Sequence, residues 1–193
     1  LALAMTLKQS LLLVCLIITS NLFAQEKQPS DIFWETLASH CGKAYKGHLA
    51  LPENDEAFGG KELVMHVRSC SDNEIKVPFF VGEDRSRTWV FTKKDGIITL
   101  KHDHRHEDGS EDAVTQYGGT ASNVGKEDIQ FFPADPHTQQ LIPAAATNVW
   151  WVTLDDTTFT YNLRRLGRDS VFKVVMDITK PIATPEAPWG WKD

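Results

Sequence analysis

The segment RTWVFTKKDGIITLKHDH (residues 87–104) has the pattern of a β-hairpin. β-Branched and aromatic residues recur in both halves, and these are the side chains that pleated strands favour. Between the halves lies Lys94-Asp95-Gly96, which has the composition of a tight hairpin turn. The segment therefore predicts two adjacent antiparallel strands.

Strand patterns continue on both sides of this hairpin. Before it, KELVMHVRSC (61–70) and EIKVPFFVG (74–82) alternate apolar residues on one face. After it come DAVTQYGG (112–119), DIQFF (128–132), VWWVTL (149–154), TFTYNLRRL (158–166) and SVFKVVMDI (170–178). Short turns containing Gly, Asp or Pro separate these segments, and a Pro-rich tail begins at about residue 180.

A short helix is predicted ahead of the strands, in SDIFWETLASHCGKAYKG (30–47). Ser30 has the side chain of an N-cap, Ile32, Phe33 and Leu37 form an apolar stripe, and Gly42 ends the helix.

About ten strands and almost no helix predict an all-β fold. We expect an antiparallel meander β-barrel with a short N-terminal helix, formed by one domain over residues 25–193. A two-sheet β-sandwich is the alternative.

The first residues have the pattern of a secretory signal. Lys8 supplies a positive charge, LLLVCLII (11–18) is an apolar run, and Ala24 offers a small residue for cleavage. A signal peptide over residues 1–24 predicts export to the periplasm or the exterior of a bacterial cell. Its removal takes away Cys15 and leaves Cys41 and Cys70, which predicts one disulfide worth about 3 kcal/mol.

Charge and hydropathy exclude two classes of partner. The formal net charge is −6, whereas sequence-independent binding of nucleic acid needs a basic face. No apolar run after the signal approaches the roughly 20 residues that span a bilayer, so no membrane span is expected in the mature chain.

A cluster of histidines lies in LKHDHRHEDGSED (100–112). If the strand extends that far, His102, His104 and His106 continue the face set by Ile98 and Leu100. Two imidazoles at i and i+2 can bind one zinc or iron ion when another strand supplies a third ligand. The candidates for that ligand are His66, Glu107 and His137.

The alternative interpretation of this cluster is a solvated hairpin. Residues 101–112 carry two basic and five acidic side chains, and EDGS (107–110) is a good turn sequence. In that case the histidines pair with neighbouring carboxylates and have no chemical role, and this interpretation carries more weight.

Aromatic residues fall on several predicted strands, where they normally form core. A barrel of this size can instead be hollow, with the same side chains lining a cavity. The side chains predicted to line it are Trp89, Phe91, Trp151, Phe159 and Tyr161, and Trp150 is a further aromatic residue on these strands.

Three resemblances follow from these patterns. LASHCGKAYKG (37–47), leading into a succession of hairpins, resembles the lipocalin and fatty-acid-binding barrels, which implies a ligand inside the barrel. VGEDRSRTWV, LKHDHRHEDG, FFPAD and APWG resemble segments of an uncharacterised group of secreted bacterial proteins. Gly96 followed by His102-Asp103-His104 resembles the first cupin motif, which implies a metal-dependent enzyme, although the glutamate of that motif is out of place.

The leading functional prediction is non-enzymatic binding of a small, partly apolar molecule inside the barrel. A cupin-like metal-dependent enzyme and a non-catalytic envelope interaction protein with a solid barrel are the alternatives. A hollow aromatic interior favours the binder, converging imidazoles favour the enzyme, and a filled interior favours the interaction protein. Motifs for a serine nucleophile, a zinc protease or a phosphate-binding loop do not occur.

Overall fold

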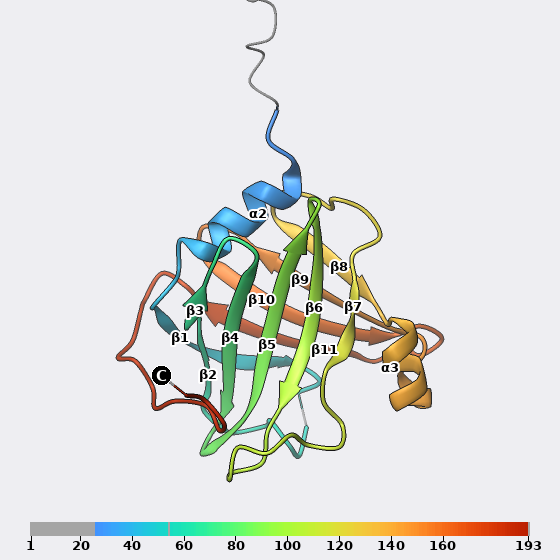
Figure 1. Ribbon diagram of the computed structural model, residues 1–193. Helices are drawn as coiled ribbons and strands as arrows, with labels where there is room; N and C mark the ends of the chain where they lie inside the picture. The colour runs from blue at the N-terminus through green and yellow to red at the C-terminus, as the bar shows by residue number, and fades with distance from the viewer. Residues whose placement is uncertain (1–25, 54, 193) are drawn as a thin grey trace, which may run out of the picture.

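The computed structural model describes residues 26–53 and 55–192, which form one antiparallel sheet curled into a nearly closed barrel (Figure 1). The predicted signal peptide lies outside the described residues. The strands are β1 (Ala44–Leu51), β2 (Leu63–His66), β3 (Ser69–Cys70), β4 (Glu74–Val81), β5 (Asp84–Lys94), β6 (Ile97–His104), β7 (Tyr117–Thr120), β8 (Ile129–Pro133), β9 (Asn148–Leu154), β10 (Thr158–Arg165) and β11 (Val171–Asp177). The helical elements are α2 (Pro29–Ala38), α3 (Pro136–Leu141) and the 3-10 turn η2 (Pro143–Ala145).

The strands follow a meander. Their order around the sheet is β7-β6-β5-β4-β2-β1-β11-β10-β9-β8, with the short β3 paired to β4 alone. The β1–β11 pair joins the first strand to the last, so the curl places β7 beside β8. All strands belong to this one sheet, which confirms the predicted barrel over the two-sheet sandwich.

The seam between β7 and β8 is narrow because β7 carries two glycines. Gly119 forms a single bridge with Ala134, and the amide of Asp135 donates to the Gly118 carbonyl at 3.0 Å. A Cβ atom on Gly119 would lie 1.8 Å from the Pro133 carbonyl oxygen. The close approach of these backbones therefore requires glycine.

The β5–β6 hairpin forms as predicted, with Asp95 and Gly96 as its two-residue turn. Both residues have positive φ, 51° and 75°, as the right-handed twist of a tight hairpin demands. In β6, Ile98, Leu100 and His102 are buried and alternate with partly exposed neighbours, so one face of the strand points into the barrel.

Helix α2 covers the end of the barrel at which this turn lies (Figure 1). Phe33, Trp34 and Leu37 of the helix are buried in the core. The predicted N-cap, Ser30, instead lies inside the helix, which begins at Pro29, and its hydroxyl donates to the Gly96 carbonyl at 2.6 Å. Gln28 is the residue that precedes the first turn, and it makes no side-chain cap.

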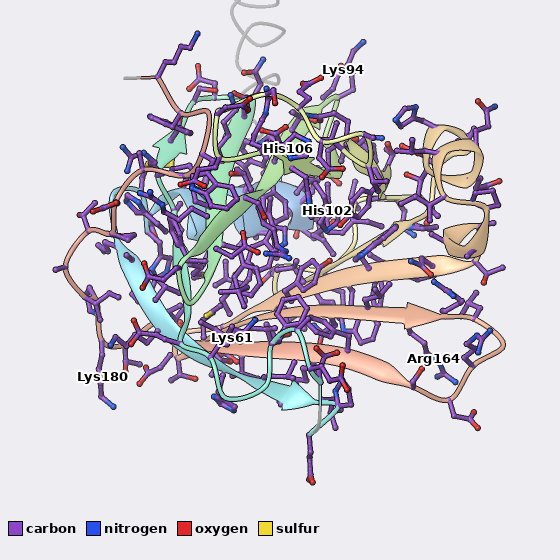
Figure 2. All side chains as sticks on the ribbon, turned by 90° about the horizontal axis from the view of Figure 1, so that it is seen from below. Lys61, Lys94, His102, His106, Arg164 and Lys180 are labelled. Carbon is purple, nitrogen blue, oxygen red and sulfur yellow. A yellow bond between two sulfur atoms is a disulfide. The ribbon has the colours of Figure 1, made fainter. Side chains whose placement is uncertain are left out.

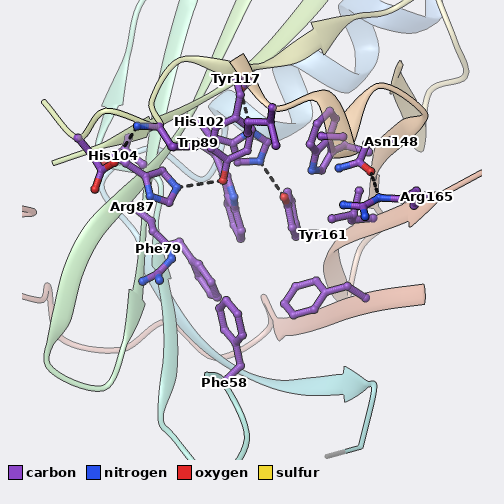
Figure 3. A pocket seen from close by; sticks show the side chains of 18 residues that line it. Phe58, Phe79, Arg87, Trp89, His102, His104, Tyr117, Asn148, Tyr161 and Arg165 are labelled. Atoms are coloured by element: carbon purple, nitrogen blue, oxygen red, sulfur yellow. Dashed lines mark hydrogen bonds between the residues drawn. The ribbon is translucent and has the colours of Figure 1, made fainter. Parts of the chain in front are cut away.

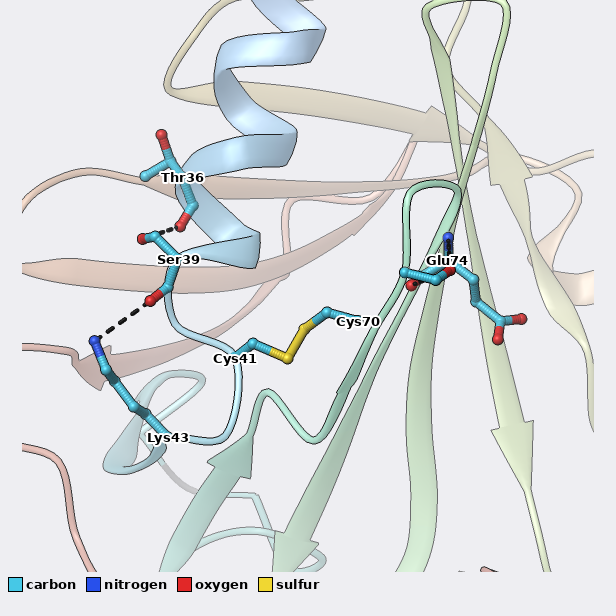
Figure 4. Close-up of a disulfide and its surroundings, with 7 residues drawn as sticks. Thr36, Ser39, Cys41, Lys43, Cys70 and Glu74 are labelled. Carbon is cyan, nitrogen blue, oxygen red and sulfur yellow. Dashed lines mark hydrogen bonds between the residues drawn. A yellow bond between two sulfur atoms is a disulfide. The ribbon is translucent and has the colours of Figure 1, made fainter.

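The predicted disulfide between Cys41 and Cys70 is confirmed (Figure 4). The two Cα atoms are 6.2 Å apart, and the bond ties the segment after α2 to β3. None of the helices within the described residues is long and apolar enough to cross a lipid bilayer.

The C-terminal segment (residues 179–192) runs along the outside of the barrel. The amide of Ile182 donates to the Ala44 carbonyl at 2.8 Å, and its side chain packs on a small outer cluster of Ala44, Val64 and Phe80. Further on, the amide of Trp189 donates to the carbonyl of Arg85, at the start of β5. The predicted tail is thus an ordered cover for the outer face of the first strands.

Candidate functional site

The barrel encloses a cavity of about 480 Å³. Inward-facing side chains of β4, β5, β6, β9 and β10 form its wall, as Figure 3 shows. Tyr117 of β7, Phe172 of β11, and Ile142 and Ala145 at η2 also line it. The β1–β2 loop adds Phe58, and the β6–β7 loop adds Asp112 and Val114. The β1–β2 and β6–β7 loops lie at the end of the barrel away from α2 (Figure 1), and the part of the cavity that they line is called its mouth here. Viewed from there, His102 lies within the ring of strands (Figure 2).

Stacked aromatic rings form one wall of the cavity. The Trp89 indole stacks against Phe79 and against Tyr161, with ring centroids 4.6 Å apart in both pairs. Phe58 continues the stack from Phe79 toward the mouth, at 6.2 Å. The rings come from three strands and a loop, and their faces give the cavity a broad apolar surface.

His102 is a buried polar group in the deep end of the cavity, the part farthest from the mouth. Its Nδ1 lies 3.0 Å from the Tyr117 carbonyl oxygen, which only accepts, so Nδ1 carries the proton and donates. Its Nε2 therefore accepts from the Tyr161 hydroxyl, 2.7 Å away. Burial lowers the pKa of His102 to about 3, so the imidazole is neutral at physiological pH.

Tyr117 joins the two inward histidines. Its ring stacks on His102 with centroids 4.5 Å apart, and its hydroxyl lies 3.1 Å from His104 Nε2. Burial raises the pKa of Tyr117 to about 12 and that of Tyr161 well above its usual value. Burial, followed by the charge of Arg87, lowers the pKa of His104. The deep part of the cavity is therefore uncharged.

Charged groups line only the outer part of the cavity. Arg87 forms an ion pair with Asp84, three residues earlier on β5. Arg165 donates from Nε to the side-chain oxygen of Asn148 at 3.1 Å. Asp112 accepts from the Val114 amide and lies 4.0 Å from His106.

The structure separates the histidines that were predicted to share a metal ion. His102 and His104 line the cavity, but β6 ends at His104, and His106 lies beyond it, exposed to solvent. His66 alternates with the inward Met65 on β2, so it lies with Val64 on the outer face of the sheet. The other two candidates, Glu107 and His137, are exposed.

Metal coordination by these side chains has no support in their arrangement. Among the described residues, no group of three His, Cys, Asp or Glu side chains could hold a metal ion. Moreover, the unprotonated nitrogen of His102, Nε2, already accepts the hydrogen bond from the Tyr161 hydroxyl. The solvated-hairpin interpretation fits His106, whereas His102 is a buried part of the cavity wall.

The aromatic residues predicted to line the cavity divide into three groups. Trp89 and Tyr161 do line it. Phe91 and Phe159 are fully buried in the core beside it. Trp151 lies on the outer face of β9, where it stacks with Phe131.

The inward position on β9 belongs to Trp150, which is 1% exposed. Asn148, Trp150, Val152 and Leu154 share the buried face of this strand, a period of two that is present in the sequence. Because residues 149–152 are apolar without a break, the period alone does not say which tryptophan points inward. Tyr117, Asn148 and Arg165 were not predicted as site residues.

No family model, curated protein or solved structure matches this chain. The resemblance to an uncharacterised group of secreted bacterial proteins therefore stays a prediction. What the chain does share with lipocalin-like proteins is architecture: a nearly closed antiparallel barrel with a helix across one end.

Proposed function

We propose that this protein binds a small, partly apolar molecule inside its barrel, without catalysis, in the manner of a lipocalin-like carrier. The observation that carries the proposal is the 480 Å³ cavity itself. Small-molecule sites commonly have volumes of roughly 300–1,000 Å³, with mostly apolar walls and a few well-placed polar groups. Here the walls are stacked aromatic rings, and the polar groups are His102, Tyr161, Asn148 and Arg165.

Two observations favour this function over the alternatives. The interior is hollow, whereas an interaction protein that presents only its outer surface has no need of an internal cavity. Two imidazoles line the cavity, yet one has both nitrogens engaged in hydrogen bonds, which disfavours a cupin-like enzyme.

We further propose that the protein acts outside the cytoplasm of a bacterial cell, in the periplasm or beyond. The sequence pattern of residues 1–24 supports export. The Cys41–Cys70 disulfide adds support, because such bonds form and persist in oxidising compartments.

Titration with a neutral, apolar fluorescent probe, phenylnaphthylamine, tests the proposed function. Leu163 lines the cavity from β10, so Leu163→Trp is expected to weaken probe binding by about 10-fold or more by filling the space. Arg164→Trp is the matched control, because it adds the same side chain at the next residue, which is exposed. Absence of probe binding in the parent protein, or equal binding by the Leu163 variant, would contradict a site inside the barrel.

A further inference from the structure

We infer that the molecule bound in the cavity is an amphiphilic carboxylic acid whose carboxylate pairs with Arg165. The inference rests on the proposed function and names its ligand class. Its basis is a contrast between the two arginines of the cavity wall. Arg87 forms an ion pair with Asp84, whereas no carboxylate of residues 26–53 or 55–192 lies within 4.0 Å of the Arg165 guanidinium.

Arg165 lies at the boundary between the cavity and its mouth. Tyr161, Leu163 and Arg165 share the inner face of β10 at successive alternate positions, so the face changes from aromatic to aliphatic to cationic. In Figure 3, Arg165 reaches into the cavity beside Asn148 and Tyr161. Arg165 and Leu163 also line a shallower recess that adjoins the cavity, which places the guanidinium between apolar interior and solvent.

Asn148 fixes the orientation of this guanidinium. Asn148 is buried, with 6% of the residue exposed, and its side-chain oxygen accepts from Arg165 Nε at 3.1 Å. This bond leaves the two terminal NH₂ groups of Arg165 as donors, and a carboxylate can accept from such groups in a bidentate pair. A positioned guanidinium also loses less conformational freedom when the acid binds.

Nearby acids do not neutralise Arg165. Asp112 lies on the His104 side of the cavity, where its charge acts on that imidazole. Asp55 lines the adjoining recess, but one of its oxygens accepts from the amides of Ala57 and Phe58, and Arg168 lines the same recess. The mouth beside Arg165 is therefore suited to one negative charge.

The deep end of the cavity fixes the orientation of the ligand. His102, Tyr117 and Tyr161 are neutral there, and aromatic rings surround them. A carboxylate placed among them would be desolvated without a cation to pair with. The apolar chain of the acid therefore occupies the deep end, and its carboxylate stays at Arg165.

Competition between the neutral probe phenylnaphthylamine and two ligands of equal chain length, decanoic acid and decanol, tests this inference. The parent protein is expected to bind the acid about 10-fold or more tightly than the alcohol, since hydrogen bonds to charged groups are the stronger ones. Arg165→Gln is expected to abolish that preference. Arg164→Gln, which removes the neighbouring exposed charge, is expected to keep it.

The outcomes separate the ligand class from the proposed function. If probe and decanol bind but the acid binds no more tightly, or if its preference survives Arg165→Gln, the inference is wrong and the binding function stands. If Arg164→Gln removes the preference equally, the effect comes from general surface charge, and the assignment to Arg165 fails. If neither the probe nor either ligand binds, the proposed function fails, and the inference fails with it.

Discussion

At the scale of single residues, His102 links the stability of the protein to pH. Its pKa is about 3 in the folded protein and about 6.5 in an unfolded chain. As the pH falls through this interval, the unfolded chain takes up a proton that the folded protein does not. The free energy of unfolding is therefore expected to fall below about pH 6.5, by up to about 1.4 kcal/mol per pH unit.

Urea unfolding at a series of pH values measures this dependence. Burial also lowers the pKa of His40, His66 and His104, and these residues add a loss of the same sign. His102→Gln is expected to reduce the slope, whereas the same substitution at the exposed His106 is expected to leave it unchanged. The assignment to His102 fails if both variants keep the slope of the parent protein.

At the scale of one element, β9 offers a matched pair of adjacent tryptophans. Trp150 faces the cavity and is buried, so Trp150→Ala is expected to lower the free energy of unfolding by about 3–5 kcal/mol. Trp151 stacks on Phe131 outside the barrel, and Trp151→Ala is expected to cost about 1 kcal/mol. Urea unfolding of both variants at one pH gives the comparison. A larger loss for Trp151 would mean that the pairing of β9 is shifted by one residue, so that Trp151 and not Trp150 faces the cavity.

Elements differ in how far their sequence predicts them. The β5–β6 hairpin was predictable because its strand pattern and its Asp95-Gly96 turn agree. The inward direction of His102 was predictable too, because Ile98 and Leu100 set the face. In β9, by contrast, both faces carry apolar residues, so local pattern could not orient it.

The site itself depends on contacts between distant elements. The His102–Tyr161 bond joins residues 59 positions apart, and the His102–Tyr117 stack depends on the loop between β6 and β7. Such pairs follow from strand register and barrel closure, which local alternation does not specify. Arg165 could have been found by extending the alternation from Tyr161 to the end of β10.

At the scale of the whole molecule, the C-terminal segment completes the outer surface of the barrel. Deletion of residues 181–193 would expose the outer cluster of Ala44, Val64 and Phe80. We expect the shortened protein to keep its β-sheet circular dichroism but to lose about 2 kcal/mol or more in free energy of unfolding. Urea unfolding of the shortened and full chains measures the loss.

An ion pair alone does not account for this expected loss. Glu186 pairs with Arg85 from the same segment, but its side chain is 83% exposed. Glu186→Gln is therefore expected to change the free energy of unfolding by less than about 1 kcal/mol. A deletion no more harmful than this substitution would show that the segment contributes little apolar packing.

The glycines at the seam also constrain how this protein can evolve. A methyl group on Gly118 would lie 2.0 Å from the Leu100 carbonyl oxygen, and one on Gly119 would meet Pro133. Either mutation would require the backbone of β6 or β8 to move, and a compensating mutation that allows this movement seldom arises at the same time. Leu163 and Arg165, which line the cavity near its mouth and are partly exposed, can be exchanged without moving a strand, so lineages descended from this sequence are free to change their ligand while they inherit the same pair of glycines.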